Sequence, residues 1–122
     1  VDDLDRIAVF YEQTMGFRQF QRVHSSVAGE PMEEIILVHG EGMGQSVPLV
    51  VWKWPNRPAP AASDVILGFQ TKDVAALVAK VVAAGGSVVE APREDPEHGV
   101  RVAFAKDPDG RLMELVELLG GS

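Results

Sequence analysis

A glutamate stands within an apolar stretch near the end of the sequence. The segment DPDGRLMELVEL, residues 107–118, begins with turn-forming residues and continues as an apolar run typical of a β-strand. Side chains alternate between the two faces of a strand, so Glu114 shares a face with Leu112, Val116 and Leu118. Burial of a lone carboxylate is costly. The sequence therefore predicts that Glu114 is paired, protonated, bound to a cation or open to a polar cavity.

Two interpretations of Glu114 remain open at this point. In the first, Glu114 is structural and pairs with Arg22 or Arg101 from a neighbouring strand, because buried charges are as a rule paired. In the second, Glu114 faces a solvent-connected cavity and acts as a catalytic base or as a metal ligand. We favour the second and treat Glu114 as the candidate catalytic residue.

Histidines are the next candidates. His39 closes a predicted strand on the face of Ile35 and Leu37, so its ring is placed to point inward. His98 lies in a predicted loop. Imidazole ionises near neutral pH, so both rings are suited to acid–base chemistry. We predict that His39 and His98 contact a ligand, and that His24 is a surface residue.

The two tryptophans lie two positions apart and share a strand face. If Leu49 faces a ligand cavity, both indoles face the other way, into a helix-packed layer or a subunit interface, whereas a one-residue bulge would reverse the two faces. Trp52 is then expected to pack in the core. Trp54 ends its strand beside a proline, and aromatic residues are favoured at binding surfaces. We therefore predict Trp54 as a third ligand-binding residue.

Composition excludes several classes of function. The 122 residues contain no cysteine, which excludes disulfides and thiolate metal sites and fits a reducing compartment, so we expect a cytoplasmic protein. No apolar run reaches the ~18 residues of a membrane span, and the acidic start is unlike a secretion signal. The net charge of −7 argues against a nucleic-acid partner and is compatible with a cationic small-molecule ligand.

An internal repeat organises the chain. The segment DLDRIAVFYEQTMGF, which begins at Asp3, corresponds to DVAALVAKVVAAGGS, which begins at Asp73. Each aspartate occupies a helix N-cap position, and apolar residues then recur at helical spacing. The repeat predicts helices over Leu4–Met15 and Val74–Ala84. Each helix ends at a glycine suited to a left-handed backbone, Gly16 in one copy and Gly86 in the other.

Three strand-like stretches follow each helix. They are Phe17–Ser25, Met32–His39 and Val47–Trp54 in the first half, and Ser87–Ala91, Val100–Ala105 and Arg111–Leu118 in the second. A further strand, Asp64–Thr71, precedes the second helix. By the repeat, the first half is also expected to open with a strand, although only Val1 and Asp2 precede its helix cap.

These elements predict an α+β fold of two tandem βαβββ modules. Module one covers residues 1–54, a proline-rich linker covers 55–63, and module two covers 64–122, within one domain of residues 1–122. The run REDPEH, Arg93–His98, is expected to be a solvated loop because prolines bracket it.

Two segments carry a family resemblance. Residues 3–17 are similar to the D-L-x-x-(A/S)-x-x-F-Y-x-x-x-L-G-F signature of the vicinal oxygen chelate superfamily, and HGVRVAFAKDPDGRLMELVE, residues 98–117, resembles its G-x-x-x-x-F-x-D-P-D-G-x-x-x-E-L ending. That superfamily includes glyoxalase I, bleomycin-resistance proteins and extradiol dioxygenases. The resemblance implies a curved-sheet cup with the helices outside, but no single reaction.

The resemblance also implies a set of metal ligands. In many members a divalent metal lies in the cup, with ligands from the first and last strands of each module. Glu114 matches the glutamate that follows D-P-D-G. The remaining positions are not matched by a ligand; they fall on Leu49 or Pro48, and on Ile66 or, with slippage, Asp64 or Gln70. We therefore expect no metal cofactor, unless a strand preceding residue 1 supplies a ligand.

Two functions are compatible with these observations. The first is a glyoxalase-like lyase or isomerase that binds a small oxygenated molecule in the cup, with Glu114 as base or metal ligand. The second is a metal-free drug-binding protein of the bleomycin-resistance type, which the acidic composition fits. In either case we expect a homodimer, because members of this fold commonly pair modules and an unpaired sheet edge needs cover.

Overall fold

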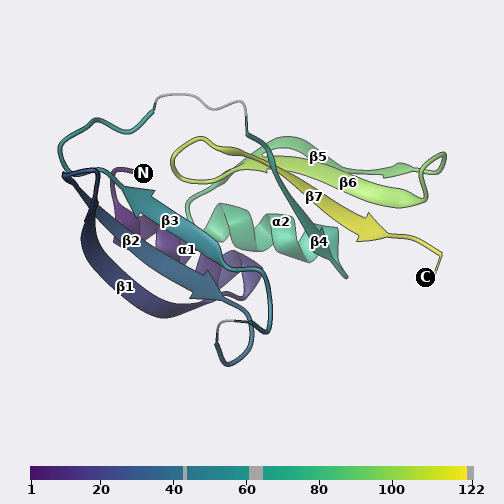
Figure 1. The fold of residues 1–122 in the computed structure, drawn as a ribbon. Coiled ribbons are helices and arrows are strands. Elements are labelled where there is room, and N and C mark those ends of the chain that lie inside the picture. The colour runs from purple at the N-terminus through teal and green to yellow at the C-terminus, as the bar shows by residue number, and fades with distance from the viewer. Residues whose placement is uncertain (43, 61–64, 121–122) are drawn as a thin grey trace. The chain divides into compact units, whose positions relative to one another are not determined.

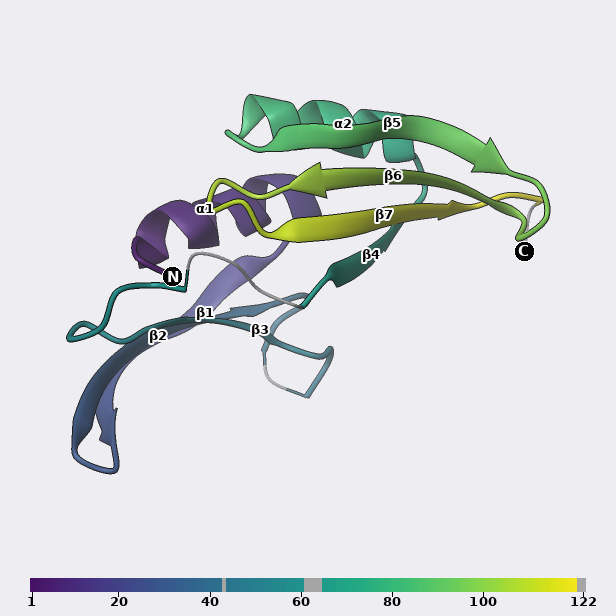
Figure 2. The same cartoon turned by 90° about the horizontal axis from the view of Figure 1, so that it is seen from above.

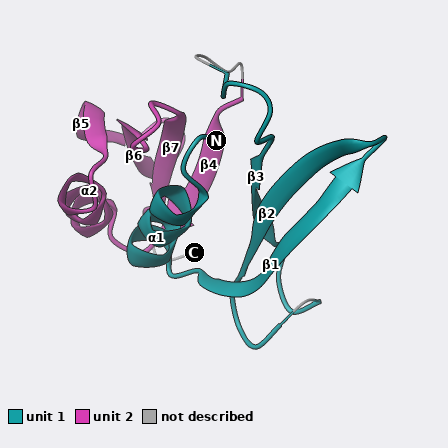
Figure 3. Cartoon of the chain, turned by 90° about the vertical axis from the view of Figure 1, so that its left-hand side faces the viewer, with its two compact units in different colours: residues 1–61 teal, residues 62–122 magenta. Residues whose placement is uncertain are grey.

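The computed structural model describes residues 1–42, 44–60 and 65–120. The chain forms two compact units, residues 1–61 and 62–122, coloured separately in Figure 3. The boundary falls within the predicted linker 55–63. Each unit contains one helix packed on one β-sheet, so the predicted α+β fold with one helix per module is confirmed.

Unit 1 contains helix α1 (Leu4–Met15) and a three-stranded antiparallel sheet in the order β1-β2-β3 (Figure 1). Its strands are β1 (Arg18–Val27), β2 (Glu30–Val38) and β3 (Leu49–Lys53). The Asp3 carboxylate accepts a hydrogen bond from the Arg6 N–H, and Gly16 follows the helix with a φ of 71°. Both predicted end signals of this helix are therefore confirmed.

Unit 2 contains helix α2 (Val74–Ala83) and a four-stranded sheet in the order β4-β7-β6-β5, seen from two directions in Figures 1 and 2. Its strands are β4 (Leu67–Thr71), β5 (Ser87–Asp95), β6 (Val100–Lys106) and β7 (Leu112–Leu118). β4 runs parallel to β7, and the other pairs are antiparallel. Unit 2 therefore has the predicted βαβββ order.

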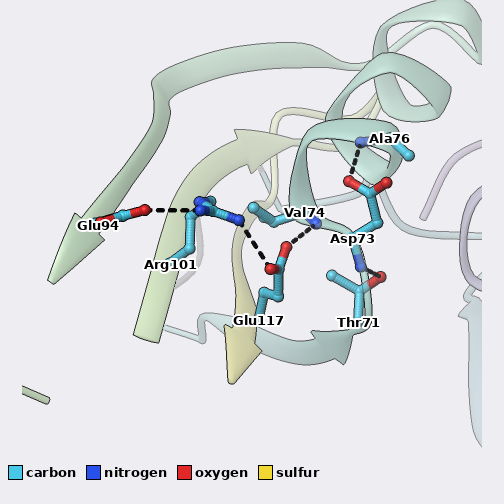
Figure 4. A network of polar contacts seen from close by, with 7 residues as sticks. All are labelled: Thr71, Asp73, Val74, Ala76, Glu94, Arg101 and Glu117. Carbon is cyan, nitrogen blue, oxygen red and sulfur yellow. Dashed lines mark hydrogen bonds and ion pairs between the residues drawn. The ribbon is translucent and has the colours of Figure 1, made fainter. Parts of the chain in front are cut away.

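A polar network connects the start of α2 to the sheet (Figure 4). Asp73 caps the helix by accepting from the Ala76 N–H at 3.0 Å. Glu117 accepts from the Val74 N–H at 2.9 Å and from the Arg101 guanidinium at 2.8 Å. The second Arg101 nitrogen donates to Glu94 at 2.7 Å. The carboxylates satisfy helix N–H groups that have no partner within the helix.

The end of α2 differs from the prediction. The left-handed backbone conformation belongs to Gly85, with a φ of 99°, and not to Gly86. Gly86 is required for another reason, because a Cβ atom there would lie 2.5 Å from the Lys106 carbonyl oxygen and 2.6 Å from a methyl carbon of Val81. It permits close approach of the α2 end to β6.

Some predicted boundaries are corrected. β5 extends to Asp95, so the first half of the predicted loop Arg93–His98 belongs to a strand. The antiparallel pairing with β6 continues through these residues and overrides the flanking prolines. β4 begins at Leu67, and the predicted start of this strand, Asp64, lies outside the described residues.

The two faces of the unit 2 sheet are distinct. One face packs on α2 and carries fully buried residues of the two central strands: Ala103, Ala105, Met113 and Leu115. Alternate residues occupy the opposite face, here called the open face. Cross-strand pairs on the open face are Phe104 with Glu114 and Val102 with Val116. The predicted face of Glu114 is therefore the open face.

None of the helices that the structure describes is long and apolar enough to cross a membrane.

Candidate functional site

A cavity of about 320 Å³ lies on the open face of unit 2. Its walls are mostly apolar, and polar side chains from β5, the following turn and β7 open into it. It is lined by Arg93, Asp95, His98, Val100, Val102, Phe104, Glu114 and Val116. The cavity brings together two residues that were predicted from sequence, Glu114 and His98.

Glu114 is a half-buried carboxylate at the β7 side of this cavity. Opposite it are Phe104 on β6 and Gly68 on β4. Glu114 makes no hydrogen bond or ion pair with any described residue. Its environment is thus that of a carboxylate with a free acceptor facing a solvent-connected space.

Both arginines named in the structural alternative for Glu114 pair with other carboxylates. Arg101 lies on the helix-packed face and donates to Glu94 and Glu117. Arg22 belongs to unit 1 and pairs with Asp5 of α1. Neither proposed partner is available to neutralise Glu114, so the carboxylate is not part of an ion pair among the described residues.

His98 forms a dyad with Asp95 at the other end of the cavity. The His98 Nδ1 atom lies 2.9 Å from an Asp95 carboxylate oxygen. Hydrogen bonding by His98 lowers the pKa of Asp95 below its ordinary value, and the charges of His98 and Arg93 add to the effect. Donation from Nδ1 to a carboxylate leaves Nε2 of a neutral imidazole as the acceptor.

The turn that carries the dyad is internally bonded. The His98 N–H donates to the Asp95 carbonyl at 3.2 Å, and the Gly99 N–H donates to the Pro96 carbonyl at 3.3 Å. The Leu119 N–H, beyond β7, donates to the Gly99 carbonyl at 2.9 Å. These bonds hold His98 at the end of the β5–β6 hairpin.

Asp95, Glu97 and His98, here called the hairpin cluster, offer ligand atoms that lie within 4.8 Å of one another. Glu97 and His98 are exposed, and the His98 ring is already bonded to Asp95. The cluster has the donor types of a cation site. Its exposure is also typical of solvated charges without a metal.

The described residues of unit 2 opposite Glu114 do not supply a family-type set of metal ligands. On the open face of β4, Gly68 is directly opposite Glu114 and offers no ligand atom. Ile66, the in-register family position, precedes β4 and is apolar. Gln70 lies opposite Val116, two residues further along the strand. Three or more protein ligands are usual, and the described residues near Glu114 do not provide them.

His39 lies in unit 1, just after β2. Its Nε2 atom is 2.8 Å from the carbonyl oxygen of Met15, the last residue of α1, and its ring stacks on Phe17 at a centroid distance of 4.0 Å. These contacts give the ring a structural role at the helix end. A role for His39 in ligand binding stays a prediction.

Leu49 lies on the buried face of the unit 1 sheet and not on a cavity face, so the two tryptophans do not face the helix-packed layer. Leu49 pairs with the fully buried Leu37, on the face that also carries Val51, so Trp52 and Trp54 belong to the other face. The indoles pack edge to face at 5.3 Å. The core packing expected for Trp52 on the helix side is therefore corrected.

Trp54 is partly covered by a cation. The Arg57 guanidinium carbon lies 4.3 Å from the centre of the Trp54 ring, and its nitrogens donate to both carboxylate oxygens of Glu30 at 2.5 Å. The hydrogen bond from Arg57 lowers the pKa of Glu30. Trp54 is thus half-buried just beyond β3 with Arg57 over its ring, and its contact with a ligand stays a prediction.

Sequence reasoning missed Arg93 and Asp95 as cavity residues. Both were placed in a loop, although they extend β5 and pair with Val102 and Val100. The signal that could have identified them is their spacing, because residues two apart on a strand share a face.

Comparisons with known proteins agree with this fold. Lactoylglutathione lyase of Arabidopsis thaliana is 30% identical over 122 residues, which cover 96% of this chain and 41% of that protein. A probable lactoylglutathione lyase of Vibrio cholerae is 27% identical over 120 residues, 96% of this chain and 84% of that protein. The chain therefore spans about two fifths of the plant relative and most of the bacterial one.

Solved structures show the same fold. A glyoxalase I variant from Zea mays superimposes with a TM-score of 0.79 at 20% identity, over 98% of this chain and 43% of that chain. A glyoxalase family protein from Bacillus cereus superimposes with a TM-score of 0.75 at 21% identity, over 98% of this chain and 89% of that chain. A family model matches residues 1–115, and the chain accordingly belongs to the Glyoxalase/Bleomycin resistance protein/Dioxygenase superfamily.

Proposed function

We propose that this protein binds a small oxygenated molecule in the open-face cavity of unit 2 and acts on it as a lyase or isomerase. Glu114 is the proposed catalytic base. The observation that carries the proposal is a carboxylate with no hydrogen bond or ion pair to any described residue, inside a cavity whose other walls are largely apolar. Two curated relatives with lactoylglutathione lyase in their names support the reaction class.

The proposed chemistry is proton transfer. A carbon or hydroxyl beside a carbonyl group, placed against Glu114, would lose its proton to the carboxylate, which would return it to a neighbouring atom. The apolar side chains of Val102, Phe104 and Val116 would hold the rest of the molecule and limit access of water. No step is assigned to a metal, because the ligand set near Glu114 is incomplete.

The test is a pair of matched substitutions. Glu114→Gln keeps the size of the side chain and removes its basicity, and we expect it to lower turnover of S-lactoylglutathione by a factor of about 10²–10⁴. Glu41→Gln, at an exposed position in unit 1, removes the same charge and should leave turnover unchanged. Equal activity of wild type and Glu114→Gln would refute the assignment of the base.

A second candidate is a metal-free binding protein. It is favoured by the incomplete ligand set near Glu114 together with the net charge of −7, which attracts cationic molecules. Calorimetric titration with bleomycin separates the candidates. Stoichiometric binding that weakens in Glu114→Gln, without turnover of any thioester, would support sequestration over catalysis.

A homodimer is also proposed. In unit 1, β3 pairs with β2 along one edge, and the Val1 ammonium donates to the Trp52 carbonyl on the other side at 2.7 Å. Among the described residues no further strand pairs with β3, so its edge offers backbone groups to a second chain. Light scattering at micromolar concentration should give twice 13.2 kDa, and a mass near 13.2 kDa would contradict the dimer.

A further inference from the structure

We propose that Arg93 is the residue that selects the ligand, by binding an anionic group at the end of the cavity away from Glu114. This inference rests on the proposed function, since it takes the open-face cavity as the binding site. It adds the chemical class of the ligand: an elongated molecule with a hydroxyl or enolisable carbonyl at one end, an apolar middle and a carboxylate or similar anion at the other.

The arginines of unit 2 differ in whether they form ion pairs. Arg101 donates to two carboxylates, and Arg111 donates to the fully buried Asp107 carboxylate at 2.7 Å. Arg93 has no carboxylate oxygen within 4.0 Å of its guanidinium among the described residues. It is therefore the arginine in this unit whose donors remain available, and it lines the cavity.

The acid that neighbours Arg93 on the open face, Asp95, is bonded to His98. Asp95 lies two residues along β5 and shares the open face with Arg93. Its carboxylate is bonded to His98 rather than to Arg93, although the Arg93 charge contributes to its lowered pKa. Because Asp95 is bonded to His98, it does not form an ion pair with Arg93. The guanidinium donors of Arg93 can therefore bind a planar anion.

Arg93 and Glu114 lie well apart in the sheet. Arg93 pairs with Val102 on β6, and Glu114 pairs with Phe104, two residues further along. Two strand spacings of about 4.8 Å and two residues of about 3.4 Å place the two Cα atoms about 12 Å apart. Val102 and Phe104 lie between them. A ligand that contacts both charges must therefore be elongated and apolar in the middle.

The net charge of the whole protein is unfavourable for anions. A net charge of −7 repels anions in general, so an anionic ligand needs a local cation to bind. Arg93 supplies it within the cavity. A cationic drug would gain from Glu114 and Asp95 and would be opposed by Arg93, so the proposal also separates the two candidate functions.

The experiment compares ω-hydroxycarboxylates of increasing chain length with their methyl esters, by ligand-observed NMR titration at low salt. The ester keeps the hydroxyl and the apolar chain and removes only the anionic charge. We expect the acid of optimal length to bind wild type about five- to tenfold more tightly than its ester. This ratio is smaller than that expected for a buried ion pair, because Arg93 is exposed to solvent. Arg93→Gln should abolish this difference and leave ester binding unchanged.

Two further variants sharpen the result. Arg93→Lys should retain part of the preference, because an ammonium lacks the planar fork. Lys72→Gln removes one positive charge from the exposed β4–α2 connection and should retain all of it. Circular dichroism of each variant checks that the fold is kept.

The failures of the two proposals are distinguishable. Equal binding of acid and ester to wild type, or a preference that survives in Arg93→Gln, would overturn the role of Arg93 while leaving the cavity as a binding site. If neither acid nor ester binds, and Glu114→Gln has no effect on turnover, then the proposed function fails and the role of Arg93 fails with it.

Discussion

The close approach of α2 to β6 at Gly86 makes Gly86→Ala a sharp test of the packing. The new methyl group would lie 2.5 Å from the Lys106 carbonyl oxygen and 2.6 Å from a Val81 methyl carbon. The carbonyl belongs to β6 and cannot rotate away, so the helix end and the strand must separate. Overpacking of this kind costs about 1–3 kcal/mol, and the upper end applies because one contact is backbone.

Part of this cost is offset in the unfolded chain. Alanine has fewer accessible backbone conformations than glycine, which stabilises the folded state by about 0.4–1 kcal/mol where the backbone is compatible. Gly86 has no positive φ, so the backbone accepts alanine. The net expectation is a loss of about 2 kcal/mol, or a fall in Tm of about 8 °C for a chain of this size.

Urea and thermal denaturation followed by far-ultraviolet circular dichroism measure the effect. The matched control is Gly68→Ala on β4, where a Cβ would meet nothing within 4 Å and φ is not positive. We expect the control to change the free energy of unfolding by less than about 0.5 kcal/mol. An unchanged midpoint for Gly86→Ala, or an equal fall for Gly68→Ala, would refute the packing argument.

Glu117→Gln should lower the denaturation midpoint more than Glu94→Gln, because Glu117 joins both Arg101 and the start of α2 whereas Glu94 is exposed; equal midpoints would contradict this. The Asp95 pKa, followed by NMR, should lie below its ordinary value and rise in His98→Ala. The stability that this depressed pKa contributes is present above the ordinary aspartate pKa and is lost as pH falls through the lowered one. An Asp95 pKa that His98→Ala does not change would contradict the assignment of His98 as the cause of the shift. Metal analysis should find no stoichiometric zinc, nickel or iron bound by this chain alone; metal that is lost on substitution within the hairpin cluster would instead place a site there.

Helix positions were predictable because their signals are local. The capping aspartates, the helical spacing and Gly16 act within a few residues, and α1 begins and ends where predicted. The face of Glu114 was predictable from the alternation of a short, regular strand. That no described residue pairs with Glu114 was not predictable, because ion pairs depend on which strands become neighbours.

Irregular pairing explains most of what the sequence did not reveal. β5 and β6 change register between Val88 and Glu90 and again between Glu90 and Arg93. Such bulges interrupt simple alternation, and the prolines beside Arg93 favoured a loop, so the contribution of Arg93 to the cavity was missed. The tryptophan face was inverted for a different reason: β3 pairs regularly with β2, and the pairing of Leu49 with the buried Leu37 places Leu49 on the buried face.

The location of the two indoles has a practical consequence for spectroscopy. Trp52 and Trp54 are the only tryptophans of the sequence and both belong to unit 1, where their rings lie 5.3 Å apart and Arg57 covers one of them. The intrinsic emission of the protein therefore originates in unit 1, and the cavity in unit 2 has no indole chromophore of its own. Phe104→Trp would place an emitter in the cavity wall, and excitation of that ring would make ligand occupancy directly visible as a change in its fluorescence.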